Sequence, residues 1–127
     1  MAYNSPKTLQ AIESPVIDLL TTGAKFAFNI PQNFLYIGTV YYCVDLQGPS
    51  GTAGTTSLGY NSPNYDNVNG NSGVANFTQI SDSITSAIGA TTNNVIPANS
   101  DIYVNVSVAI TGRTVETMKV FLLGFYV

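Results

Sequence analysis

Residues 102–110 read Ile-Tyr-Val-Asn-Val-Ser-Val-Ala-Ile, and this stretch decides the class of fold. An apolar residue occupies every second position, with tyrosine, small or polar residues between. Successive side chains of a β-strand point to opposite faces, so this segment presents one continuous apolar face. We predict a strand with that face on a hydrophobic core. The core-facing residues are Ile102, Val104, Val106, Val108 and Ile110.

The C-terminal segment, 115–127, carries the second strong strand pattern. It ends in Val-Phe-Leu-Leu-Gly-Phe-Tyr-Val over 120–127 and is apolar on both faces. Such a strand is either central in a sandwich or covered on its outer face by a partner. Because Thr111-Gly112-Arg113 is typical of a tight turn, we expect the two strands to form a hairpin.

Earlier parts of the chain carry weaker strand patterns. The segments concerned are 15–20, 24–30, 34–46 and 55–60. In the second of them Phe26, Phe28 and Ile30 recur with period two, which predicts that they share one face. The third is a long run of aromatic and β-branched residues, which favours a strand.

The intervening stretches have the composition of loops. Residues 47–54 are rich in Gly and Pro, and 61–73 are rich in Asn. Residues 74–89 fit a short helix and a strand equally well, because apolar residues recur there with helical spacing but polar residues interrupt the pattern.

These patterns predict an all-β protein: an antiparallel β-sandwich with the topology of a single jelly roll, with room for one short helix. Eight strands of about six residues suit a chain of 127 residues. An immunoglobulin sandwich is disfavoured, because the chain has no Trp and a single Cys. We expect one domain over 21–127, preceded by an N-terminal arm or first strand over 1–20.

The composition excludes several kinds of chemistry. With no His and one Cys, the chain cannot build a His-based triad, a His-ligated metal site or an internal disulfide. Four basic residues against seven acidic ones, with net charge −3, disfavour nucleic acid as a partner. Residues 1–10 are polar and include Pro6, so we expect no signal peptide, no membrane association and synthesis in a host cytoplasm.

The carboxylates are dispersed along the chain. They are Glu13, Asp18, Asp45, Asp66, Asp82, Asp101 and Glu116. A glycosidase needs two of them across a cleft, a pairing that sequence spacing does not identify. Asp66 offers one oxygen to a calcium ion, with no second carboxylate beside it. Cys43 lies within an apolar strand pattern, which favours a buried, inert thiol. We therefore expect no enzyme, and no catalytic, cofactor-binding or metal-binding residue.

Tyrosine is frequent, with eight residues. Its large amphipathic ring suits protein interfaces and carbohydrate platforms, and it suits half-buried strand positions equally well. Tyr60 and Tyr65 are the candidates for exposed binding residues, because they border or lie within the Asn-rich stretch.

Three stretches together resemble a known family. They are the aromatic strand after Ile30-Pro31, the segment Ser-Leu-Gly-Tyr-Asn-Ser-Pro-Asn-Tyr-Asp-Asn at 57–67, and residues 95–127 with their Asp-Ile-Tyr strand start and Gly-Phe-Tyr ending. This order resembles small single-jelly-roll proteins of tailed bacteriophages that decorate or cement heads, or form part of fibres. The last 33 residues are the most specific part of the match.

The resemblance implies a structural protein of the virion, a homotrimer bound to the major capsid protein on the outer surface of the head. An acidic chain would be repelled by packaged DNA, which also favours the outer surface. The alternative is a glycan-binding module of a tail fibre or spike. Leu9 and Ile12 are the candidate shell contacts, because the segment 1–14 has too few apolar residues to fold alone. The loop 61–73 is expected to face solvent.

Overall fold

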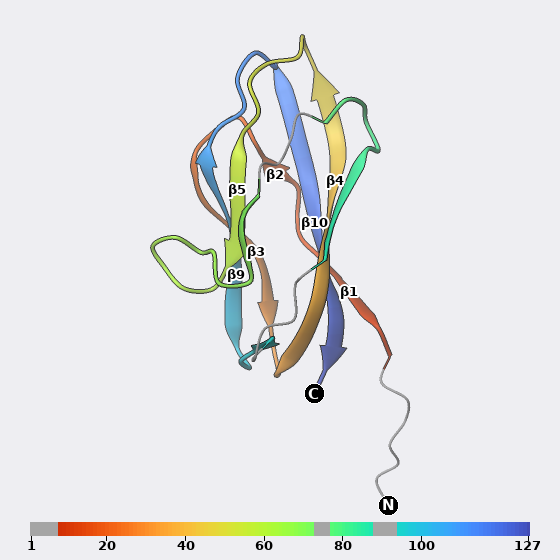
Figure 1. Ribbon diagram of the computed structural model, residues 1–127, viewed down its shortest axis with the longest axis vertical. Coiled ribbons are helices and arrows are strands. Elements are labelled where there is room, and N and C mark those ends of the chain that lie inside the picture. Colours follow the sequence, from red (N-terminus) through yellow and green to blue (C-terminus); the bar gives the residue numbers. More distant parts are fainter. Residues whose placement is uncertain (1–7, 73–76, 88–93) are drawn as a thin grey trace, which may run out of the picture.

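The computed structural model describes residues 8–72, 77–87 and 94–127 and consists of two antiparallel sheets packed face to face (Figure 1). The six-stranded sheet has the order β1 (Gln10–Glu13), β10 (Val115–Tyr126), β4 (Phe34–Gln47) and β7 (Ser83–Ala87), with β2 (Ile17–Asp18) on β10 and β8 (Val95–Ile96) on β4. The four-stranded sheet has the order β3 (Gly23–Ile30), β9 (Ser100–Val108), β5 (Thr55–Gly59) and β6 (Asn69–Ser72).

The strand order is that of a jelly roll. Apart from β2 and β8, which are two residues long, eight strands form two layers in the orders β1-β10-β4-β7 and β3-β9-β5-β6. The chain therefore passes repeatedly from one sheet to the other, as in a double Greek key. The predicted antiparallel β-sandwich is confirmed. The described residues form no helix, and hence none that is long and apolar enough to cross a membrane.

The predicted hairpin of the last two strands is wrong. β9 pairs with β3 and β5, whereas β10 pairs with β1, β2 and β4 in the other sheet. The connection between them closes one end of the sandwich: Ile110 is buried, and its N–H donates to the carbonyl of Leu19 at 3.0 Å. Gly112, at φ +87°, lies so close to Gly51 that any side chain would collide with its backbone. Because Ile110 is bonded to Leu19 and Gly112 lies against Gly51, this segment does not form a tight turn between β9 and β10.

Val108, a predicted core position, and Phe26, predicted to share a face with Phe28 and Ile30, are both exposed because of register shifts. The β5–β9 ladder shifts by one residue near its end, so Val108 is 50% exposed and the chain re-enters the core only at Ile110. The β3–β9 ladder shifts between Phe26 and Phe28, which leaves Phe26 48% exposed on the outer face. An extra residue in one strand shifts the alternation of side chains next to it to the opposite face.

The structure assigns strands within the ambiguous stretch 74–89 and within the predicted loop 61–73. Within 74–89, residues 83–87 form strand β7, which fits the strand alternative rather than the helix. Within 61–73, residues 69–72 form strand β6, so the predicted loop is shorter than expected. The rest of these stretches at 73–76 and 88–89 lies outside the described residues.

The core lies between the inner faces of the two sheets and includes one polar bridge. The side-chain amide of Asn69 in β6 donates to the hydroxyl oxygens of Tyr41 at 2.8 Å and Thr39 at 3.2 Å, both buried in β4. A buried hydroxyl needs such a partner, because leaving it unsatisfied costs about 1–3 kcal/mol. The bridge therefore fixes the position of one sheet on the other.

Candidate interaction surfaces

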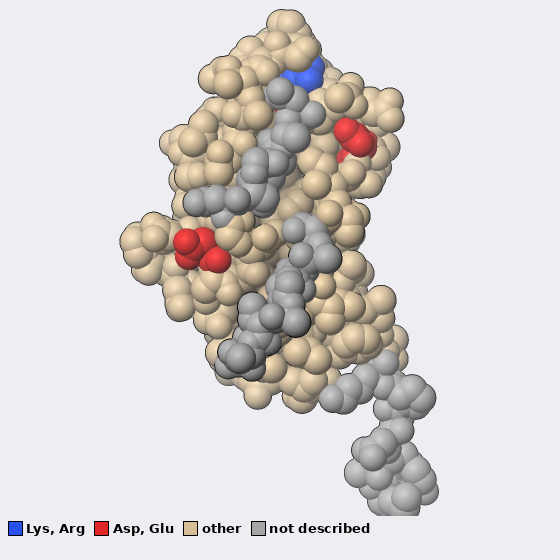
Figure 2. All heavy atoms as spheres, in the orientation of Figure 1, with Lys and Arg blue, Asp and Glu red and all other residues tan. Residues whose placement is uncertain are grey.

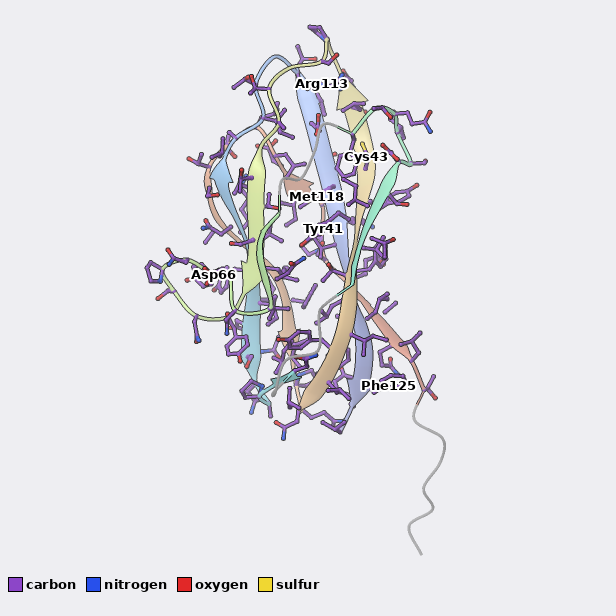
Figure 3. The ribbon with its side chains drawn as sticks, in the orientation of Figure 1. Tyr41, Cys43, Asp66, Arg113, Met118 and Phe125 are labelled. Atoms are coloured by element: carbon purple, nitrogen blue, oxygen red, sulfur yellow. The ribbon has the colours of Figure 1, made fainter. Side chains whose placement is uncertain are left out.

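The charged side chains pair locally and are not gathered into a centre. Asp18 lies 4.0 Å from the ammonium of Lys25, and Glu13 pairs with Lys119 across β1 and β10. In the part of the chain that the structure describes, no pocket is present and no three Cys, Asp or Glu side chains are placed to hold a metal ion. Asp66 is exposed on the loop that projects from β5 (Figures 1 and 3).

Arg113 and Glu116 form a buried ion pair at one end of the sandwich (Figure 3 labels Arg113). The Nε of Arg113 lies 3.2 Å from Oε1 of Glu116, and its two terminal nitrogens donate to the carbonyls of Gly48 and Phe77, each at 2.9 Å. Burial raises the pKa of Glu116, while the guanidinium opposes that rise. The pair thus ties two loops to the start of β10, and its role is structural.

Cys43 is an enclosed thiol in β4. It is fully buried, and burial, together with the carboxylates of Glu116, Asp82 and Asp45, raises its pKa to about 11. A thiol reacts as its thiolate, so this environment suppresses its nucleophilicity. The expected buried and inert cysteine fits this geometry.

The outer surface of the six-stranded sheet is apolar over its two central strands. Half-buried apolar side chains of β4 and β10 point away from the core in adjacent rows, and we call this surface the β4–β10 face. Its residues are Leu35, Val40, Tyr42, Phe121, Leu123 and Phe125. Ile37, at a bulge in β4, adds a side chain that is 46% exposed. The ion pair of Lys119 and Glu13 bounds this face beside Phe121. The apolar side chains beyond that pair are partly open to solvent, which makes the face a candidate contact surface.

The outer surface of the four-stranded sheet has a different character. Polar side chains dominate it: Asn29, Asp101, Asn105 and Ser107. Tyr65 is half-buried and lies on the ring of Tyr103, whereas Tyr60 packs against the core. Of the two candidate loop tyrosines, Tyr65 therefore belongs to this surface.

The candidate shell contacts lie at the edge of the six-stranded sheet. Leu9 is 53% exposed just before β1, whereas Ile12, within β1, is half-buried and packs against the core. Sequence reasoning missed Phe26 as a surface residue, whereas the alternation of 102–110 already placed Tyr103 on the face away from the core. The alternation around Phe26 resembles any other strand pattern, and only the bulge in β3 places Phe26 outside.

Comparisons with known proteins show one solved structure with a similar fold. No protein-family model and no curated protein matches the chain. Among solved structures, a chain of the cyanophage Pam1 capsid asymmetric unit is similar, with a TM-score of 0.62 and 13% sequence identity. The match covers 100% of this chain and 91% of the other, so the two are of similar length and share the sandwich throughout.

Proposed function

We propose that this chain is a non-enzymatic structural protein of the virion that decorates, or cements, the outer surface of a bacteriophage head. The observation that carries the proposal is the likeness of fold, over nearly all of both chains, to a chain of a cyanophage capsid asymmetric unit. A shell-bound protein needs extended contact surfaces, and the β4–β10 face is one.

The β4–β10 face supports a homotrimer. Its apolar side chains would leave water when another copy packs on them, which is the main driving force of permanent association. β10 lies between β1 and β4, so a neighbouring subunit would pack on its face and would not extend the sheet. A trimer also matches the threefold positions of an icosahedral lattice.

The major capsid protein is the proposed second partner, reached through the N-terminal segment. Leu9 exposes its side chain where β1 begins, at the edge of the sandwich. The Asn-rich loop after β5 belongs to the other sheet, which leaves it free to face solvent.

Charge favours the outside of the head. The chain has net charge −3. Of its basic residues, Lys25 and Lys119 are paired with carboxylates and Arg113 is enclosed with Glu116. The described residues thus present no concentrated positive surface for packaged DNA, which phosphate binding requires.

Sedimentation of purified protein tests the trimer. We expect the native chain to sediment as a trimer at micromolar concentration, and Leu123→Lys to dissociate it because a charge at the centre of the β4–β10 face must be desolvated on assembly. Val108→Lys, on an exposed residue of the other sheet, should leave the trimer intact. A stable native monomer, or a folded Leu123→Lys variant that remains trimeric, would contradict this assignment.

Binding to heads tests the decoration. Heads assembled from the major capsid protein of the same genome should retain the protein at a fixed copy number through gradient purification. Leu9→Ser should weaken that retention without unfolding the chain, because the side chain is already exposed. Failure of the native chain to bind both empty and filled heads would refute the decoration role; normal binding by Leu9→Ser would refute the arm as the contact.

A further inference from the structure

Three aromatic side chains form a row on the outer surface of the four-stranded sheet. Phe26 from β3 meets Tyr103 from β9 edge to face, with ring centroids 5.8 Å apart. Tyr65, from the loop after β5, lies against the other side of Tyr103 at 4.8 Å. We call these three residues the aromatic row. Phe26 is 48% exposed, so part of its ring is open to solvent.

The loop that carries Tyr65 projects from the sandwich, but it is tied to the outer face of the sheet by packing and hydrogen bonds (Figure 1). Gly59 makes this possible, since a Cβ there would lie 2.3 Å from Oδ1 of Asn67 and 2.7 Å from the backbone of Tyr65. The carbonyl of Asn64 accepts hydrogen bonds from Ser57 at 2.9 Å and Asn105 at 3.2 Å, both on the outer face of the sheet. The backbone around Tyr65 is therefore held against the sheet before any ligand arrives, and its ring lies against Tyr103.

Tyr65 also has an unfavourable backbone. Its φ of +47° is rare for a bulky residue, and the N–H of Tyr65 is held by the carbonyl of Asn61 at 2.8 Å. Such strain persists where the surroundings enforce it, and it is concentrated at ligand sites. Glycine or asparagine would adopt this conformation more easily, so the loop alone does not call for a tyrosine here.

The polar groups around the aromatic row are amides, hydroxyls and carboxylates. The amide of Asn29 donates to Asp101 at 2.9 Å beside Phe26, and Asp66 is exposed on the loop (Figure 3). Lys25 is next to Phe26 in β3, but its ammonium is bonded to Thr21 and lies beside Asp18. The other described basic residues are in the six-stranded sheet or at the end of the sandwich. Figure 2 shows few charged side chains on this side of the molecule, and an acidic side chain lies on the projecting loop.

We propose that the aromatic row and its amides form a binding site for a neutral oligosaccharide. A sugar ring has an apolar face of C–H groups, which packs on an aromatic ring, and an edge of hydroxyl groups, which bonds to amides and carboxylates. Carboxylates without a neighbouring cation disfavour acidic saccharides, because like charges repel. This site goes beyond the decoration role, and it lies on the sheet opposite to the β4–β10 face, so a trimer formed through that face leaves it open.

The test uses the full chain and a panel of microbial polysaccharides and defined oligosaccharides that includes both neutral and acidic glycans, with binding followed by surface plasmon resonance and by NMR shifts. Phe26→Leu removes the ring but keeps an apolar side chain, and Phe26→Tyr keeps the ring. Tyr65→Asn removes the second ring and suits the backbone. Ile80→Ala, an exposed apolar residue elsewhere, is the matched control.

We expect a neutral glycan to bind, with Phe26→Leu and Tyr65→Asn each weakening binding by at least about tenfold. Phe26→Tyr and Ile80→Ala should bind as the native chain does, and all four variants should keep the native sedimentation and head binding. The proposal is overturned if no glycan of the panel binds, if acidic glycans alone bind, or if both ring variants bind normally. It is also overturned if footprinting of Phe26 shows protection in the free trimer, since the row would then be a contact between subunits.

Discussion

Arg113 and Glu116 show how a single buried pair supports a charge-poor protein. Arg113→Met would leave the fully buried carboxyl of Glu116 without its partner and would release Gly48 and Phe77. Breaking a buried pair in this way costs about 3–5 kcal/mol. We expect urea unfolding to show that loss. The double variant Arg113→Met/Glu116→Met should recover most of it, and an equally large loss in the double variant would contradict the charge argument.

The same pair predicts a pH dependence. Burial raises the pKa of Glu116 above its ordinary value of 4.5, so the folded chain binds more protons than the unfolded chain between that value and the raised one. The contribution of Glu116 to the free energy of unfolding is therefore present below pH 4.5 and lost as pH rises through the raised pKa. Relative to Glu116→Gln, native stability should fall over that window. Arg113→Met should extend the fall to higher pH, and parallel profiles would contradict this.

Cys43 offers a direct probe of unfolding. With a pKa of about 11, it is roughly one part in a thousand thiolate at pH 8, and it is fully buried. A chromogenic disulfide reagent should leave the native protein unmodified and should titrate one thiol after denaturation in urea. Rapid modification of the native chain would show that this end of the sandwich opens readily.

At the scale of elements, β9 shows where an alternating pattern stops being informative. Val106 is 1% exposed and Val108 is 50% exposed, although both fit the same period-two pattern. An aspartate at the buried site leaves an unpaired charge in a dry core, whereas one at the exposed site stays solvated. We expect Val106→Asp to abolish cooperative folding and Val108→Asp to change stability by about 0.5 kcal/mol or less. Thermal melts followed by circular dichroism distinguish the two. Similar behaviour of both variants would contradict the bulge.

At the scale of the whole molecule, we predict a binding protein without hydrolytic or metal-dependent activity. A chelator should leave the melting temperature and the sedimentation of the native chain unchanged. Glycans that bind should be recovered intact by mass spectrometry after long incubation. Turnover that disappears when one carboxylate is replaced, with the fold preserved, would contradict this.

The sequence predicts a surface feature when it arises from neighbouring residues. It does not predict a feature that depends on the pairing of strands distant in sequence. The Asn-rich composition of the loop and the candidate Tyr65 were evident in the sequence. The aromatic row was not, because Phe26 joins it only through a bulge that depends on pairing with β9. The sequence predicted part of the β4–β10 face. An apolar outer side of the C-terminal strand was expected, but β4 was not identified as the strand beside it.

The sequence by itself determined the longer strands and the sandwich, but not β6 or β7. The period-two alternation and the Gly, Pro and Asn between strands act within a few residues. The tertiary structure decided the pairing. β9 and β10 are consecutive strands joined by residues 109–114, whose Thr111-Gly112-Arg113 suits a hairpin turn, yet they lie in opposite sheets. Buried Ile110 and Arg113 hold that connection across the end of the sandwich. Their hydrogen-bond partners, Leu19 and Phe77, are distant in sequence. Alternation specifies which side of a strand faces the core, and it carries no information on which strand lies beside it.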